Sequence, residues 1–207
     1  MKGSTKKKMV DAAIRLFYTQ GYDGTSVRDI ASSANVNIAL VSYYFGGKKA
    51  LYEKILIQFL EGYLQTMHKA IRQQTNSVQE SLLSVIRELL VYQATNHYTA
   101  RMVHREMTLD SVLVREIMTT YLRKEKHDYE QMIKLGMKKG EFQRQSVDYV
   151  IIQIRTMVNM PYLTPHYFQE LYQLSPKEPY FVDRYMEHIA RWVKAALCQP
   201  KAETGIA

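Results

Sequence analysis

Residues Leu16–Leu51 read LFYTQGYDGTSVRDIASSANVNIALVSYYFGGKKAL, the most specific pattern in this chain of 207 residues. Thr25 and Ser26 follow a turn that contains two glycines, and they precede apolar residues at helical spacing. Hydroxyl side chains in this position accept hydrogen bonds from the first backbone N–H groups of a helix. The pattern therefore predicts a short amphipathic helix that begins near Thr25 or Ser26.

A second short helix is predicted from about Asn37 to Phe45, because Val41 and Phe45 are apolar positions four residues apart. Asn35 lies between the two predicted helices. Asparagine is one of the few residues besides glycine that tolerate left-handed backbone geometry, so we expect a tight turn there. Ala31, in the first helix, is small enough to let the two helices approach each other closely.

The outward face of the second helix consists of small, apolar and hydroxyl-bearing residues and holds no acid: Asn37, Ile38, Ala39, Leu40, Ser42 and Tyr43. Such a face suits a DNA major groove, because an acid would repel phosphates, whereas asparagine pairs with adenine and apolar groups contact thymine methyls. The same residues could also be solvated positions on a three-helix domain that binds no DNA. The absence of acids favours the DNA-binding interpretation.

Taken together, these residues resemble the DNA-binding domain of the TetR family. The family pattern is matched by Leu16, Phe17, Gly21, Tyr22, Thr25, Ser26, Val27, Ile30, Ala31, Ala34, Val36, Tyr43, Phe45, Lys48 and Leu51. The resemblance implies an all-α protein with an N-terminal three-helix helix-turn-helix domain. It places the DNA-binding domain at residues 1–50 and a helical dimerisation and regulatory domain at residues 51–207.

The resemblance also implies which side chains contact DNA. The expected phosphate contacts are Thr25, Ser26, Tyr43 and Lys48, the residues nearest base edges are Asn37, Ile38, Ala39 and Leu40, and Ser42 and Tyr44 complete the set. Ser42 stands where the family usually has a tyrosine, so we expect it to make a weaker phosphate contact. Asn35, Asn37, Ala39 and Val41 also depart from the family pattern, which leaves the target sequence open.

Charge distribution supports an anionic partner. The chain has a formal net charge of +8, and its first 50 residues hold eight basic and three acidic residues, which leaves +5 in that quarter. Lys2 and residues 6–8 are predicted to form a basic arm that follows the DNA backbone or enters a minor groove. A tail that only aids solubility accounts for them equally well.

Patterns of catalytic or metal-binding residues are missing from the sequence. The six histidines and Cys198 lack metal-ligand spacing, and Gly46-Gly47-Lys48 lacks the strand and the glycine spacing of a phosphate loop. We therefore predict a protein that is not an enzyme, with no catalytic residue, no metal and no cofactor. The single cysteine, the lack of a secretion signal and the lack of an apolar run of roughly 20 residues predict a cytoplasmic, nucleoid-associated protein without a membrane partner.

The rest of the chain reads as long helices. They are expected at about 50–74, 78–98, 100–107, from a cap at Asp110-Ser111 to about 140, at 146–160 ending before Pro161, and at 180–197. Two apolar faces on the later helices predict a homodimer on palindromic double-stranded DNA: Val150, Ile151, Ile154, Met157 and Val158, and Ile189, Trp192 and Val193. Burial of both faces within one subunit is the alternative.

Charged, tyrosine and methionine side chains leave the role of the predicted domain at residues 51–207 open. A mixed-charge patch can form either an internal salt-bridge network, which the sequence slightly favours, or a docking face for a protein partner: Arg101, Arg105, Glu106, Arg115 and Glu116. Glu53 and Glu61 lie eight residues apart on an earlier helix, where a solvated face is the favoured interpretation. The candidate residues for a partner surface are Glu53, Glu61, Arg101, Arg105 and Arg115. Sixteen tyrosines and eleven methionines can line a pocket for a small-molecule effector. Such residues at helical spacing are more often core, so an effector pocket is possible but not favoured.

Four segments, at residues 35–51, 105–126, 160–167 and 178–181, resemble a TetR-family regulator of the division protein FtsZ in endospore-forming bacilli. This resemblance implies a DNA-bound dimer that inhibits FtsZ ring assembly near the pole and aids chromosome capture during sporulation. FtsZ would then be a protein partner. The alternative is a ligand-responsive TetR-type transcriptional repressor of metabolic or efflux genes.

Overall fold

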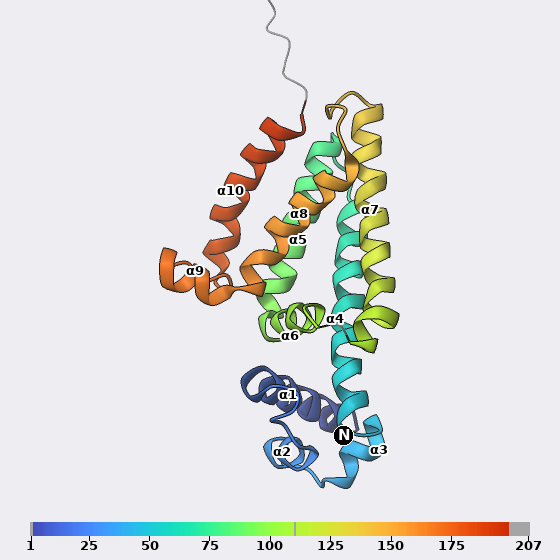
Figure 1. Ribbon diagram of the computed structural model, residues 1–207, viewed down its shortest axis with the longest axis vertical. Helices are drawn as coiled ribbons and strands as arrows, with labels where there is room; N and C mark the ends of the chain where they lie inside the picture. Colours follow the sequence, from blue (N-terminus) through green and yellow to red (C-terminus); the bar gives the residue numbers. More distant parts are fainter. Residues whose placement is uncertain (1, 110, 199–207) are drawn as a thin grey trace, which may run out of the picture. The chain divides into compact units, whose positions relative to one another are not determined.

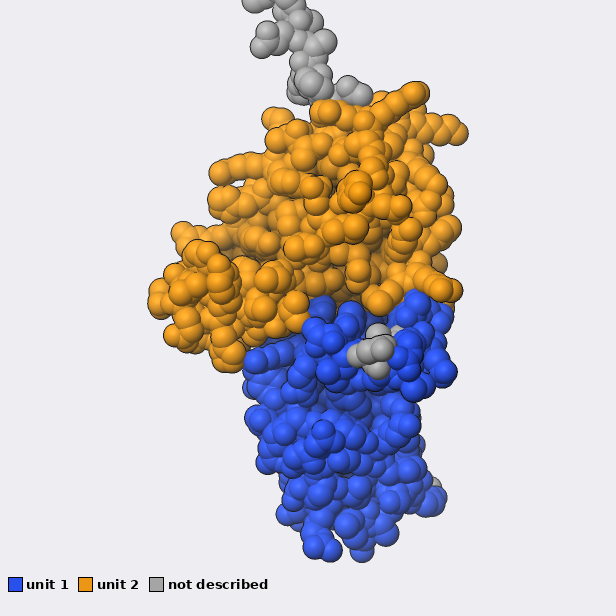
Figure 2. Space-filling model, viewed as in Figure 1, with its two compact units in different colours: residues 1–62, 96–121 blue, residues 63–95, 122–207 orange. Residues whose placement is uncertain are grey.

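The computed structural model describes residues 2–109 and 111–198, apart from the side chains at positions 2–4 and 114. Within these ranges the regular elements are helices, so the predicted all-α fold is confirmed. The chain forms two compact units, coloured separately in Figure 2: residues 1–62 with 96–121 (unit 1), and residues 63–95 with 122–207 (unit 2). No described helix has the length and apolar character that crossing a membrane requires.

Unit 1 contains the helix-turn-helix segment and a segment that comes later in the sequence (Figure 1). Its helices are α1 (Lys2–Gln20), α2 (Val27–Ser33), α3 (Ala39–Phe45), the first part of α4 (Lys48–Ile71), α6 (His97–Met107) and the π-helical η1 (Leu113–Met118). Helix α1 packs against α2 and α6, and α2 packs against α3. Large side chains from α1, α2 and α4 fill the small core, including the fully buried Phe17, Ile30 and Leu51.

The N-terminal lysines are helical, in contrast to the arm that the sequence predicted. Helix α1 begins at Lys2, so residues 6–8 lie within it and are exposed. Met9, Ala12 and Ala13 follow at helical spacing and are fully buried. Burial of this apolar face stabilises the helix, and the preceding lysines extend it toward its N-terminus.

Unit 2 contains α5 (Val78–Thr95), most of α7 (Thr119–Lys138), α8 (Val147–Leu163), α9 (Pro165–Tyr172) and α10 (Pro179–Ala196), besides the end of α4. Helices α8 and α10 both pack on α5, and α9 packs on α8. Leu82, Ile86 and Leu89 of α5 are fully buried in this packing. The core of unit 2 is therefore organised around α5.

The two apolar faces expected to form the dimer interface are core residues of unit 2. Val150, Ile151, Ile154, Val158, Ile189 and Val193 are each at most 3% exposed, and Met157 and Trp192 are half-buried. Helical periodicity identified the buried faces correctly, but their partner is α5 rather than a second subunit. The dimer interface predicted at these residues is therefore wrong, and the alternative of burial within one chain is confirmed.

Helix ends also differ from the sequence expectation. Helix α8 continues to Leu163, past Pro161, where the sequence predicted its end. Proline lacks the N–H that would donate to the carbonyl of Met157, and the Tyr185 hydroxyl donates to that oxygen instead at 3.2 Å. The helix predicted to begin at Asp110-Ser111 starts as η1 and continues as α7; Asp110 itself lies outside the described residues.

Candidate nucleic-acid interface

Helix α2 begins with a reciprocal cap. The backbone N–H of Asp29 donates to the Ser26 hydroxyl at 3.1 Å, and the backbone N–H of Ser26 donates to the Asp29 carboxylate at 2.9 Å. The start predicted near Thr25 or Ser26 is confirmed. The Ser26 hydroxyl also donates to the Asp29 carboxylate, at 2.5 Å. This bond first, and the bond from the Ser26 backbone N–H second, stabilise the carboxylate and lower the pKa of Asp29. The Ser-x-x-Asp spacing at residues 26–29 is the sequence signal for this reciprocal cap.

The turn between α2 and α3 has the geometry that its asparagines predict. Asn35 adopts a left-handed conformation with φ of 52°, and the N–H of Val36 closes the turn on the carbonyl of Ala31 at 3.0 Å. The side-chain oxygen of Asn37 then accepts from the N–H of Ala39 at 2.9 Å, at the start of α3. The amide nitrogen of Asn37 remains as the group to donate to a base acceptor.

Helix α3 presents its acid-free face to solvent. Val41 is fully buried against the core, whereas Ile38 is 46% exposed and Tyr43 is 77% exposed. Ala39 and Ser42 are exposed, while Leu40 and Tyr44 are half-buried. The face that the sequence predicted to meet DNA is therefore accessible to solvent, and its DNA contacts stay a prediction.

Aromatic and basic groups meet beside this face. The rings of Tyr43 and Tyr44 lie edge to face with centroids 4.9 Å apart, and the Nζ of Lys6 lies 5.0 Å from the centre of the Tyr44 ring. Lys6 comes from α1, so a basic side chain of that helix reaches α3. Sequence spacing alone gave no indication of this contact, because it depends on how α1 packs.

Two of the predicted phosphate contacts have partners within unit 1. Thr25 is 1% exposed and its hydroxyl donates to the carbonyl of Gly21 at 2.8 Å. The Lys48 ammonium donates to the carbonyl of Tyr22 at 3.0 Å and lies 4.2 Å from the centre of the Tyr22 ring. Both residues hold the turn before α2, and their predicted phosphate contacts stay predictions.

The candidate partner-surface residues make separate contacts within unit 1. Arg101 donates to the Tyr18 hydroxyl at 3.2 Å, and Arg105 donates to the carbonyl of Phe17 at 3.1 Å. These two side chains of α6 thus support the C-terminal end of α1. Glu53 pairs with Lys49 at 3.8 Å, Glu61 accepts from the Tyr121 hydroxyl at 3.4 Å, and Arg115 is exposed on η1. A docking role for the five residues stays a prediction.

Comparison with known proteins agrees with this geometry. Residues 9–55 match the model of a family described as bacterial regulatory proteins, tetR family. Over 196 residues the chain is 43% identical to the probable HTH-type transcriptional regulator YttP of Bacillus subtilis, covering 94% of this chain and 95% of that protein.

Solved structures share the fold. A tetR-family regulatory protein from Rhodococcus RHA1 aligns with a TM-score of 0.75 and 20% identity, over 95% of this chain and 98% of that one. The transcriptional regulator FadR from Bacillus subtilis, solved in complex with stearoyl-CoA, aligns with a TM-score of 0.71 and 18% identity, over 89% and 97% of the two chains.

Proposed function

Because this chain belongs to the tetR family of bacterial regulatory proteins, we propose that it is a homodimer that binds palindromic double-stranded DNA through α3. The observation that carries the proposal is the exposed, acid-free face of α3, where Ile38 and Tyr43 stand in solvent. Asn37, Ile38, Ala39 and Leu40 read base edges, and Ser26, Ser42, Tyr43 and Tyr44 contact the phosphate backbone with support from Thr25 and Lys48. The protein is then associated with the nucleoid.

The second copy docks on the exposed face of α8. Tyr149, Ile152, Met160 and Leu163 are 71%, 57%, 39% and 38% exposed, and they recur at helical spacing opposite the buried positions of the same helix. Large apolar side chains exposed along one face of a helix in this way favour an interaction surface. A self-complementary surface pairs two identical chains, and two reading helices related by a twofold axis match a palindrome.

In vitro selection from random double-stranded DNA tests the DNA-binding proposal. We expect enrichment of a palindromic sequence, bound with a steep salt dependence because the basic residues displace counterions. Enrichment of a single half-site would contradict the dimer, and enrichment of no sequence would contradict sequence-specific reading. A protein with Ala39→Glu serves as the comparison, because an acid at the centre of the face should repel the phosphates and abolish enrichment.

The finer role that we propose is control of cell division through FtsZ. Its support is the resemblance of residues 105–126, 160–167 and 178–181 to RefZ, since these segments lie outside the helix-turn-helix. A ligand-released transcriptional repressor is the second candidate. It is supported by relatives named as transcriptional regulators and by the fold shared with FadR, which was solved with an acyl-CoA.

Genome-wide occupancy of the tagged protein, paired with transcript levels during growth and starvation, separates the two roles. Division control predicts a few palindromic sites near the chromosome origin, with little change in transcripts when the gene is deleted. A repressor predicts a site beside its own gene or a metabolic or efflux gene, with derepression on deletion. The second pattern would contradict the FtsZ proposal.

A further inference from the structure

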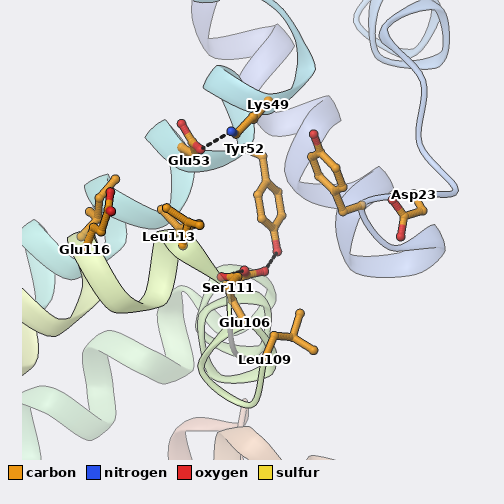
Figure 3. A pocket seen from close by; sticks show the side chains of 12 residues that line it. Asp23, Lys49, Tyr52, Glu53, Glu106, Leu109, Ser111, Leu113 and Glu116 are labelled. Atoms are coloured by element: carbon orange, nitrogen blue, oxygen red, sulfur yellow. Dashed lines mark hydrogen bonds and ion pairs between the residues drawn. The ribbon is translucent and has the colours of Figure 1, made fainter.

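A cavity of about 580 Å³ lies within unit 1 and is lined in part by the turn that leads into α2 (Figure 3). Its walls come from four places in the sequence: the Tyr22-Asp23 turn, the first turns of α4, the end of α6 with the residues after it, and η1. A volume of this size is typical of sites for small organic molecules. None of the DNA-reading residues of α3 lines the cavity.

The charged side chains around the cavity are mostly acidic. Asp23, Glu53, Glu106 and Glu116 line it, against a single lysine, Lys49. Lys49 pairs with Glu53 at 3.8 Å, and its side chain is 81% exposed, so it points largely to water. The lining therefore carries a negative charge within a protein whose formal net charge is +8.

Glu106 holds negative charge at the buried end of the cavity. It is 8% exposed, and its two carboxylate oxygens accept from the Tyr52 hydroxyl at 3.0 Å and the Ser111 hydroxyl at 2.8 Å (Figure 3). Hydroxyl donors orient a carboxylate without neutralising it. The Arg105 guanidinium beside the Tyr52 hydroxyl offsets part of this charge, but it also donates to the carbonyl of Phe17.

The remaining walls are aromatic and aliphatic. The rings of Tyr22 and Tyr52 lie with centroids 4.9 Å apart, and Leu109, Val112, Leu113 and Ile117 complete the apolar lining. Burial and the Glu106 carboxylate raise the pKa of Tyr52 to about 12, which keeps it a neutral donor. The Lys48 ammonium already lies 4.2 Å from the centre of the Tyr22 ring, so the Tyr22 ring contributes only apolar surface. The Tyr52 ring and the carboxylates are the groups that attract a cation with an apolar body.

We propose that this cavity binds a hydrophobic organic cation, with its apolar body against Tyr22, Tyr52 and the aliphatic residues and its charge near Glu106 and Glu116. An anion such as an acyl-CoA would meet repulsion from the same carboxylates. The site is therefore distinct in chemistry from one that holds an acyl-CoA.

Resting on the proposed DNA-binding function, the second part of the proposal is that occupancy of the cavity regulates DNA binding. Tyr22 and Asp23 lie in the turn that precedes Ser26, the cap of α2, and the Tyr22 carbonyl holds the Lys48 ammonium at the start of α4. A ligand in the cavity contacts residues that come before α2 in the sequence and residues that come after α3. If it binds one orientation of α3 more tightly than another, it shifts the equilibrium toward the orientation that it prefers.

Isothermal titration calorimetry of the full chain without DNA tests the site, with tetraphenylphosphonium as the probe and neutral triphenylphosphine oxide as the comparator. We expect one site per chain and cation affinity at least about tenfold above that of the neutral compound, as one partly screened charge contact supports. Glu116→Gln should weaken cation binding about tenfold, and Val112→Trp should block it by filling the cavity. Glu170→Gln, an exposed glutamate on α9, is the matched control and should leave binding unchanged.

Equal affinity for the two compounds, no binding of the cation, or binding that neither variant changes would overturn the cavity assignment. Glu116 and Val112 are both exposed, and circular dichroism shows whether each variant is folded.

The regulatory step is tested by fluorescence anisotropy with the selected palindrome: saturating tetraphenylphosphonium should shift DNA affinity in the wild type but not in Val112→Trp. Equal affinity with and without the probe would overturn that step. Failure to bind DNA without the probe would contradict the proposed function. Calorimetry would still show whether the cavity binds the cation.

Discussion

At the scale of single residues, Tyr43 is the most exposed large side chain of α3, and we propose that it contacts a DNA phosphate. It is 77% exposed, so removing it takes little from the folded protein. We expect Tyr43→Ala to weaken binding to all DNA sequences by about 1 kcal/mol per half-site, the contribution of one hydrogen bond to a phosphate. Anisotropy titrations with the selected palindrome and with scrambled DNA measure this loss.

Asn37→Ser is the control for Tyr43→Ala. A serine hydroxyl can accept from the Ala39 N–H as the Asn37 oxygen does, but it lacks the amide that donates to a base. It should relax selectivity at one base position by about 1–3 kcal/mol and leave non-specific binding unchanged. A Tyr43→Ala protein that changed sequence preference alone would contradict the phosphate role.

Gly136 is a residue where any side chain is costly. A Cβ built there would lie 2.2 Å from the ring of Phe142, which is 1% exposed. We expect Gly136→Ala to lower the free energy of unfolding by about 1–3 kcal/mol, as overpacking of a core does. Urea denaturation measures it, with exposed Leu135→Ala as the control that should change little. Equal stability of Gly136→Ala and wild type would mean that Phe142 can move aside.

Local chemistry made some residues predictable and others not. The left-handed Asn35 and the cap at Ser26 follow from their own backbone preferences, so the sequence predicted both. The hydrogen bond between Tyr52 and Glu106 joins residues 54 positions apart, and no local pattern encodes it. The cavity that these two residues line was therefore outside the reach of the sequence.

At the scale of elements, the cap of α2 makes its stability depend on pH. Hydrogen bonds lower the folded-state pKa of Asp29, so its stabilising contribution is present above the unfolded-state pKa, about 3.9, and is lost as pH falls through the folded-state value. We expect Asp29→Asn to lower Tm at neutral pH. Differential scanning calorimetry should show the difference between the two proteins shrinking as the pH is lowered below about 4.

The control for this pH dependence is Asp183→Asn. Asp183 is an exposed carboxylate of α10 that pairs with Arg87 of α5, so it does not contact α2. Its loss should leave the stability of α2 unchanged. A difference between wild type and Asp29→Asn that grew toward low pH would show that the carboxylate destabilises the helix. The Ser26 cap would then act through its hydroxyl alone.

Helix periodicity predicted which faces are buried but not what buries them. Ile154 and Ile189 repeat at helical spacing, and an apolar repeat looks the same whether its partner is α5 or a second chain. The end of α8 shows a similar limit. Pro161 has no N–H to donate to the carbonyl of Met157. The Tyr185 hydroxyl donates to that carbonyl instead, and this contact depends on how α10 packs, which the local sequence does not reveal.

At the scale of the whole molecule, the exposed face of α8 predicts the oligomeric state. Ile152 is 57% exposed at the centre of that face. A glutamate there would be buried without a partner when two copies meet, and like charges would face each other across a twofold axis. We expect the wild type to have twice the 24.2 kDa mass of one chain and Ile152→Glu to have the monomer mass, as measured by light scattering.

DNA binding reports the same change independently. A dimer engages the second half of a palindrome at a high effective concentration, so the monomeric variant should lose affinity for the full palindrome by about 100-fold or more while keeping its affinity for a half-site. Val91→Glu places the same charge on an exposed apolar position of α5 and should remain dimeric. If Ile152→Glu stayed dimeric, the second copy would have to dock elsewhere. If it became monomeric but kept its affinity for the full palindrome, the helix-turn-helix of each chain would bind DNA on its own.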